Sequence, residues 1–167
     1  MRPGFGQFQV ASEEYLQFAQ QFGATDILFN TPLIPGDGGR WQLHDLVKLR
    51  LRVEQFGMKL SALENVPTNF YDHIMLNGPK RDQQIENMIA TVRNIARAGI
   101  PIFGYNWMPS HVWRTPPVAI RGGALATAFD DNIAKKYPLT HDREYNEEEM
   151  WANLEYWIKI ITPIAEE

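Results

Sequence analysis

The sequence predicts an α/β fold built from parallel (β/α) units of a TIM barrel, about the first four of the eight, and so an incomplete barrel. Two observations lead to this fold class. Glycine follows three predicted helices, and a short apolar run follows each glycine, within residues 22–29, 56–63 and 98–105. A left-handed glycine ends a helix, and such an apolar run suits a parallel strand that is buried on both faces. Polar residues and a proline then follow each strand, which favours a barrel because its strand ends share one ligand mouth.

The remaining elements follow in order along the chain. A short first strand is expected near residues 5–10, and Ser12 then caps a helix whose apolar residues recur every three or four positions. The same periodicity predicts a second helix from Gln42 to the glycine at position 57. A third helix is expected to begin at Asp82 as its N-cap. The fourth begins at Asn146, carries three glutamates in its first turn and runs into the C-terminus.

Four predicted (β/α) units are too few to close a barrel. A complete barrel needs about 250 residues and eight strands, whereas the chain has 167 residues. We therefore interpret residues 1–167 as the N-terminal half of a (β/α)₈ barrel. An open parallel sheet exposes its edges, so a homo-oligomer or the missing barrel half is the expected partner. Residues 110–145 are too long for an ordinary barrel loop and are expected to form an extended loop or lid.

Composition excludes several functional classes. The chain has 16 Lys plus Arg against 20 Asp plus Glu, a net charge of −4, which argues against a nucleic-acid partner. No apolar run approaches the ~20 residues of a membrane span, and the first residues lack the apolar core of a signal peptide. We therefore expect a cytoplasmic protein without a membrane partner. Because cysteine is absent, a thiolate nucleophile and cysteine metal ligands are excluded within this chain.

The segment after the last predicted strand carries the most informative side chains. Tryptophan covers the C–H faces of a sugar, asparagine bonds hydroxyls, and arginine pairs with a carboxylate. This combination points to a sugar acid or polyol, with the alternative that the aromatic residues only seal the rim of the barrel. The candidates in this segment are Asn106, Trp107, His111 and Arg114.

Two further candidates precede that segment. Glu64 directly follows a predicted strand, where its carboxylate would orient a hydroxyl, act as a base or touch a metal; the alternative is a loop cap. Arg81 introduces the third helix, where it would neutralise an anionic substrate or serve as a solvated cap. The histidines have no partner at metal-ligand spacing, so no metal site is predicted within the chain.

The segments Lys80–Asn87, Ala98–Pro101 and Tyr105–Pro109 closely resemble mannonate dehydratases of the xylose-isomerase-like barrel superfamily. The Leu63–Pro67 and Ala126–Asp130 segments support the resemblance. It implies a hydro-lyase of hexuronate breakdown that dehydrates D-mannonate to 2-keto-3-deoxy-D-gluconate with a divalent metal, Mn²⁺ or Fe²⁺. It also implies that four residues lie in or near the substrate pocket, namely Glu64, Arg81, Asn106 and Trp107. His111 and Arg114 are implied to lie on the loop above the pocket.

The resemblance further implies that the metal ligands and the general acid and base come from the second half of the barrel. The catalytic residues are then expected outside this chain, and the isolated chain is expected to be inactive. Two alternatives stay open. One is a xylose-isomerase-like sugar or sugar-phosphate isomerase or epimerase, and the other is a non-catalytic half-barrel that assembles with itself or with another chain.

Overall fold

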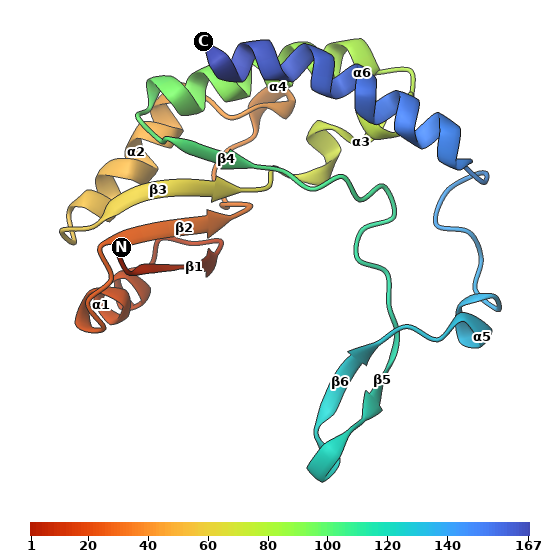
Figure 1. The fold of residues 1–167 in the computed structure, drawn as a ribbon. Coiled ribbons are helices and arrows are strands. Elements are labelled where there is room, and N and C mark those ends of the chain that lie inside the picture. Colours follow the sequence, from red (N-terminus) through yellow and green to blue (C-terminus); the bar gives the residue numbers. More distant parts are fainter.

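A computed structural model describes all residues 1–167. Its main sheet has four parallel strands in the order β1-β2-β3-β4, so each strand pairs with the next one along the chain. Strands added in sequential order build a barrel, whereas a doubly wound sheet reverses direction at a switch point. The helices line the outer side of the curved sheet (Figure 1). The strands are Gly4–Phe8 (β1), Asp26–Asn30 (β2), Lys59–Glu64 (β3) and Ile102–Gly104 (β4).

The helices begin where their capping residues predict, with one exception. The side chain of Ser12 accepts a hydrogen bond from Tyr15 N, and that of Asn146 accepts one from Glu149 N, which confirms both predicted caps. The prediction for Asp82 is wrong, because Lys80 occupies the N-cap position. Asp82 lies in the first turn, where its carboxylate still complements the positive end of the helix. The helices are Glu13–Gln21 (α1), Leu43–Glu54 (α2), Asp72–Met75 (α3), Arg81–Arg97 (α4), Asp131–Ala134 (α5) and Glu147–Glu166 (α6). None of them is both long and apolar enough to cross a membrane.

The hydrophobic core is a single cluster of 26 buried residues. Its largest members, Trp41, Trp157 and Phe29, are almost completely buried. The inner face of the sheet is different, since it borders an open hollow of about 430 Å³ whose lining includes Gly6, Leu28, Ala62 and Ile102. The helices thus cover the outer face of this four-stranded sheet, and its inner face is left uncovered.

A polar cluster ties the N-terminal ends of the strands together. The carboxylate of Asp26 accepts hydrogen bonds from Ser61 Oγ and, at 2.7 Å, from Thr25 Oγ1, and it pairs with Arg2 at 3.0 Å. The bonds from Ser61 and Thr25, followed by the charge of Arg2, hold the pKa of Asp26 below its ordinary value. Residues at this end of a barrel support its stability.

Between β4 and α6 the chain leaves the sheet and forms a separate hairpin (Figure 1). Its antiparallel strands are Thr115–Ala119 (β5) and Leu125–Ala128 (β6). Thr115 Oγ1 locks the base by donating to Ala128 O at 3.1 Å and accepting from Asp130 N at 3.1 Å. The aromatic ring of Trp113 packs edge-on against Phe129 and Tyr137. The extended segment at residues 110–145, which we call the excursion, therefore contains a hairpin and a short helix. Its role as a lid stays a prediction.

Candidate functional site

The C-terminal ends of β2, β3 and β4 lie side by side. Glu64 is in register with Asn30 on one side and with Gly104 on the other. The ladder continues one residue further, because Thr31 N donates to Glu64 O and Asn65 N donates to Gly104 O, both at 2.7 Å. The loops that follow these strands therefore start together at one edge. We call the following residues the strand-end rim: Gln7, Asn30, Thr31, Glu64, Asn65, Asn106 and His111.

The backbone of the strand-end rim is strained. Gln7, Thr31, Asn65 and His111 have φ angles of 71°, 47°, 65° and 56°. Residues other than glycine seldom adopt this left-handed region of φ, and each one in it costs about 1–3 kcal/mol of conformational energy. The only other non-glycine residue with positive φ is Asn77. Strain of this kind collects at functional sites, so the backbone marks the rim independently of its side chains.

Two side-chain pairs orient the polar groups of the rim. Gln7 Nε2 donates to Glu64 Oε2 at 3.2 Å, and Asn65 Nδ2 donates to Asn30 Oδ1 at 3.2 Å. The carbonyl oxygen of the Asn65 side chain is buried and has no hydrogen-bond partner. A buried acceptor without a donor is costly, and a ligand hydroxyl would satisfy it. The rim thus offers a carboxylate and an amide oxygen to a polyhydroxylated ligand.

A hollow of about 270 Å³ brings two of the predicted residues together. Asn106 and His111 line it with Thr31, Asn65 and Tyr71. Burial raises the pKa of the Tyr71 phenol, so this group stays neutral and able to donate a hydrogen bond. Glu64 faces the neighbouring hollow on the inner side of the sheet. Three predicted residues, Glu64, Asn106 and His111, therefore belong to the rim.

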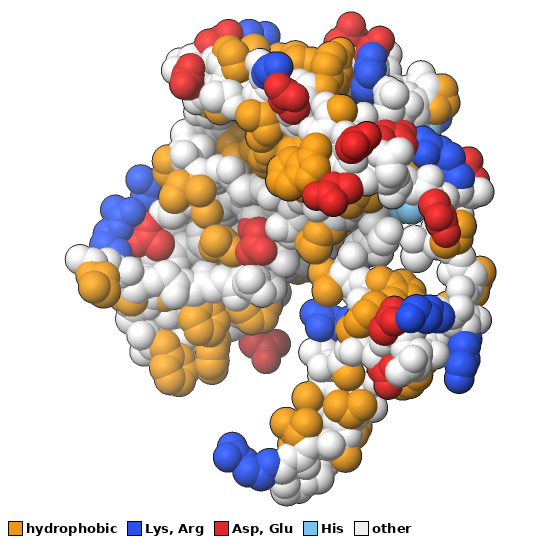
Figure 2. Space-filling model, turned by 45° about the vertical axis from the view of Figure 1, so that its right-hand side comes forward, with side chains coloured by type: hydrophobic (Ala, Val, Ile, Leu, Met, Phe, Trp, Pro, Cys, Tyr) orange, Lys and Arg blue, Asp and Glu red, His pale blue; other side chains and the backbone are white.

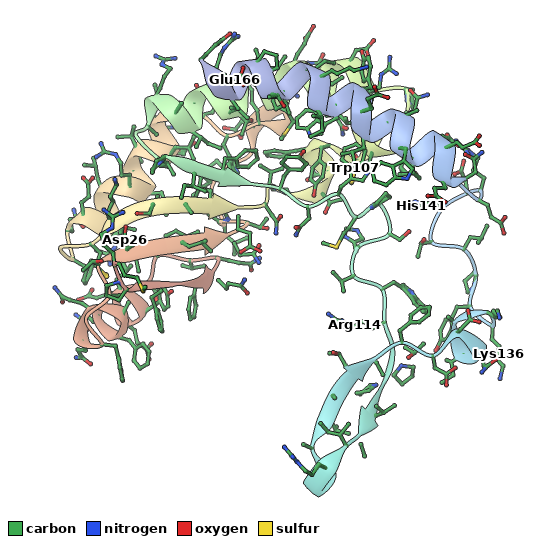
Figure 3. The ribbon with its side chains drawn as sticks, in the orientation of Figure 1. Asp26, Trp107, Arg114, Lys136, His141 and Glu166 are labelled. Carbon is green, nitrogen blue, oxygen red and sulfur yellow. The ribbon has the colours of Figure 1, made fainter.

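Trp107 lies elsewhere. It lines a different hollow, of about 470 Å³, with His141, Arg143 and Tyr145. Figure 3 shows Trp107 beneath α6, close to His141. Its ring is partly buried against the core, and its indole N–H is buried without a partner. The structure does not bring this residue to the hollow that Asn106 and His111 share.

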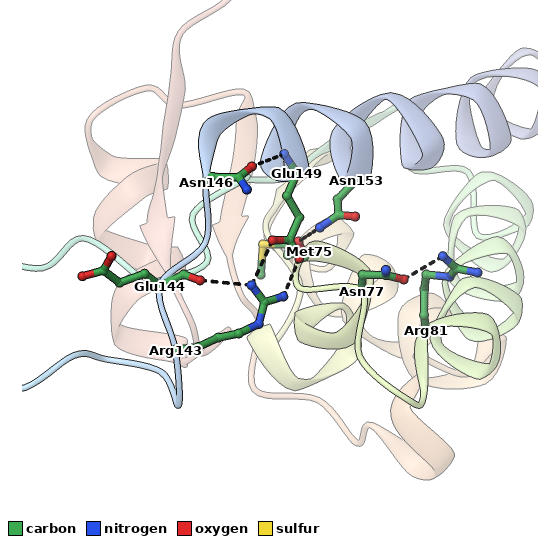
Figure 4. Close-up of polar contacts among 8 residues, drawn as sticks. All are labelled: Met75, Asn77, Arg81, Arg143, Glu144, Asn146, Glu149 and Asn153. Atoms are coloured by element: carbon green, nitrogen blue, oxygen red, sulfur yellow. Dashed lines mark hydrogen bonds and ion pairs between the residues drawn. The ribbon is translucent and has the colours of Figure 1, made fainter.

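The two predicted arginines also lie apart from the rim hollow. Arg81 Nη1 donates to Asn77 Oδ1 at 2.8 Å (Figure 4), and its guanidinium stacks 4.4 Å from the centre of the Tyr156 ring. These contacts hold Arg81 in the outer helical layer. Arg114 is exposed on the segment that leads from the rim to the hairpin (Figure 3).

Sequence reasoning did not single out the cluster that brings the excursion back to α6. Arg143 forms a two-pronged ion pair with Glu149 and donates to Glu144 O at 3.0 Å (Figure 4). Asn153 Nδ2 donates to Met75 O at 2.9 Å and links α6 to α3. The ion pair lowers the pKa of Glu149 and raises that of Arg143. This cluster fixes where the excursion ends.

A metal site does not form from the residues of this chain. No three side chains among His, Cys, Asp and Glu lie close enough together to hold a metal ion. At the rim, Glu64 is the only carboxylate, and it is paired with an amide. The donor set therefore does not fit a divalent metal site of the usual three or more protein ligands.

Comparison with known proteins places this geometry in a family. Mannonate dehydratase from Streptococcus pneumoniae (strain 70585) is 29% identical over 95% of this chain and 49% of its own length. That of Streptococcus agalactiae serotype Ia is 31% identical over 94% of this chain and 51% of its own length. The chain thus spans about half the length of the curated relatives it matches.

Solved structures agree. The crystal structure of mannonate dehydratase from Streptococcus suis serotype 2 superposes with a TM-score of 0.80 and 28% identity, over 99% of this chain and 50% of that one. A D-psicose 3-epimerase from Clostridium cellulolyticum H10 superposes over 99% of this chain with a TM-score of 0.56 and 10% identity, which shows a shared fold alone. The sequence model described as D-mannonate dehydratase (UxuA) matches residues 5–139, and the chain therefore belongs to the mannonate dehydratase family.

Proposed function

We propose that the chain supplies the substrate-binding half of a cytoplasmic mannonate dehydratase, which converts D-mannonate to 2-keto-3-deoxy-D-gluconate by loss of water. One observation carries the proposal. In a chain of this family, successive parallel strands end at one edge with hydrogen-bonding side chains and strained backbone. Active sites of barrel enzymes lie at this edge.

The rim residues divide the recognition of a sugar acid. Glu64, oriented by the amide of Gln7, accepts hydrogen bonds from substrate hydroxyls. Asn106 and His111 bond further hydroxyls in the hollow that they share. Arg114 pairs with the substrate carboxylate when the excursion at residues 110–145 closes as a lid. In this proposal Arg81 and Trp107, which are packed elsewhere, support the surrounding helices.

The second half of the barrel is the partner in this proposal. The relatives are about twice as long as this chain, and both edges of its sheet are unpaired. Apolar side chains lie exposed on the two edge strands, with Ile102 of β4 58% exposed and Phe8 of β1 41% exposed. Four further strands would cover these side chains and close the barrel.

The metal belongs to the second half in this proposal, because this chain has no donor set that fits one. A bound Mn²⁺ or Fe²⁺ supplies acidification of the proton beside the substrate carboxylate. The residues of this chain bind and orient the sugar acid and exclude water from the site.

Reconstitution tests the proposal. The chain is co-expressed with the C-terminal half of the Streptococcus suis enzyme, and the purified complex is given D-mannonate and Mn²⁺. We expect a complex that forms a 2-keto-3-deoxy acid. Glu64→Gln and Asn106→Ala should each lower kcat/KM by about a hundredfold or more. Glu86→Gln, the same exchange at an exposed position of α4, should leave kcat/KM and the yield of complex unchanged.

Three outcomes would contradict the proposal. The first is failure of the two halves to form a complex. The second is a product with altered stereochemistry and no loss of water, which would support an epimerase. The third is a stable complex that forms no product, which would support a non-catalytic assembly role.

A further inference from the structure

The hairpin has one free edge that is able to pair with another strand. Ile120 N donates to Ala124 O at 2.8 Å, and Val118 pairs with Ala126 two residues further along. Hydrogen-bonded pairs alternate with non-bonded pairs in an antiparallel ladder. The backbone N–H groups of Leu125 and Thr127 therefore point away from β5. No third strand meets them, since this sheet contains only β5 and β6.

The opposite edge of the hairpin is blocked. The register shifts between Thr115 and Val118, so that Pro116 and Pro117 of β5 together lie opposite Thr127. Proline has no N–H to donate, so the β5 edge cannot extend the ladder at this position. Only β6 presents a complete edge.

The β6 edge lacks the usual protection against pairing. Exposed edge strands normally carry charges or prolines, yet residues 122–129 contain neither. Leu125 is 72% exposed and Ile120 is 53% exposed. Figure 2 shows hydrophobic side chains along the hairpin and a cation at its tip, where Arg121 is the only charged residue of segment 115–128. A two-stranded hairpin is marginal alone, whereas three or more strands stabilise a sheet.

We propose that β6 pairs antiparallel with β6 of a second copy of this chain, which creates a four-stranded sheet in the order β5-β6-β6-β5. The second copy is the occupant because a two-fold axis makes such an edge complementary to itself. Charge supports the same arrangement. Antiparallel pairing brings Arg121 at the tip of one hairpin to the base of the other, where Asp130 is exposed beside Asp131, which also pairs with Lys135 of its own helix. The proposal concerns a surface outside the strand-end rim and does not depend on the substrate.

The mass of the chain in solution tests this pairing. Light scattering across micromolar concentrations should give a dimer of twice 19.3 kDa. Thr127→Pro removes one outward N–H and should abolish the dimer, whereas Thr127→Ala keeps the N–H and should leave it unchanged. The near-ultraviolet circular dichroism of the Trp113 cluster shows whether each variant retains the base of the hairpin.

If Thr127→Pro unfolds the hairpin, a variant that changes only a charge still tests the proposed dimer. Arg121→Glu changes an exposed tip residue and should raise the dimer dissociation constant about tenfold, because two symmetric attractions become repulsions. Adding Asp131→Lys should restore most of the affinity. A chain that is monomeric at every concentration would overturn the proposal. So would a dimer that none of the β6 or Arg121 variants weakens, because it would form through another surface.

Discussion

A buried glutamine on α4 holds the wall of the strand-end rim in place. Gln84 is 7% exposed, and its Oε1 accepts from His73 N at 2.8 Å and from Ile74 N at 3.2 Å. Its Nε2 donates to Asn69 O at 3.0 Å and to Asp72 Oδ1 at 2.5 Å. Gln84 therefore caps α3 from a different helix, since no side chain at the N-cap position of α3 does so.

Gln84→Leu removes this cap at nearly constant volume. His73 N keeps a second bond, to Asp72 Oδ1, and Ile74 N keeps one to Tyr71 O, so Asn69 O is the group that loses its donor. A buried polar group without a partner costs about 1–3 kcal/mol. Because one carbonyl is left without a donor and the two bonds to α3 are also lost, we predict that the free energy of unfolding falls by about 2 kcal/mol. Thr68 and Tyr71, which line the rim hollow on the same segment, should become mobile in the variant.

Gln84→Glu keeps the side-chain oxygen that accepts from α3 and removes only the amide group that donates to Asn69 O and Asp72 Oδ1. The new carboxylate faces Asp72 in a buried site, so burial and like charge should raise its pKa above the unfolded value. The substitution therefore costs no stability through this carboxyl below its unfolded pKa, and the loss grows as pH rises from the unfolded pKa through the raised folded pKa. The variant should therefore approach the wild type in stability as pH falls.

Urea unfolding followed by tryptophan fluorescence measures both variants. Gln83→Leu is the matched control, because Gln83 is the exposed neighbour on the same helix, and its effect should stay within about 0.5 kcal/mol. If Gln84→Leu cost no more than Gln83→Leu at an unchanged m-value, our account of the α3 cap would be refuted.

Three further substitutions test other parts of the fold. Trp157→Ala should lower the free energy of unfolding by about 3–5 kcal/mol in a urea titration, because Trp157 is 1% exposed and packs edge-on against Tyr105; a loss under ~1 kcal/mol would exclude it as the anchor of α6. Gly99→Ala should cost about 1–2 kcal/mol, because φ at Gly99 is +77°, and no change in melting temperature would contradict that geometry. Asp26→Asn should flatten the acid limb of the stability profile: the lowered pKa of Asp26 contributes stability above its unfolded pKa that is lost as pH falls through the folded pKa. An acid limb as steep as that of the wild type would show that other carboxylates cause it.

Local signals in the sequence were sufficient for the outer layer of the fold. Ser12 and Asn146 cap their helices as predicted, and Gly23, Gly57 and Gly99 all have positive φ. These features depend on a few neighbouring residues, so a single sequence reveals them. The polar residues and proline after each strand favoured a barrel, and the sequential strand order agrees with this prediction.

The hairpin was not predicted as strands, because Pro116 and Pro117 and the many small residues argue against a sheet. Its stability comes from contacts at its base that are distant in sequence, such as the bonds of Thr115 to Ala128 and Asp130. Sequence pattern alone does not reveal such contacts.

The candidate site was predictable only in part. Glu64, Asn106 and His111 share the rim because strand ends in a barrel converge. Trp107 directly follows Asn106 yet lines another hollow, and adjacency in sequence does not decide the direction of a side chain. Thr31 was missed because its signal is a positive φ on a β-branched residue, which no residue pattern announces.

We expect D-mannonate to bind at the strand-end rim, and the ring signals of the histidines report whether it does. The chain alone is labelled with ¹⁵N-histidine and assembled with the unlabelled C-terminal half of the Streptococcus suis enzyme. Adding D-mannonate should shift the ring signals of His111, which lines the rim hollow, and leave those of His44 and His73 unchanged. A saturable shift at His73 with none at His111 would contradict the account.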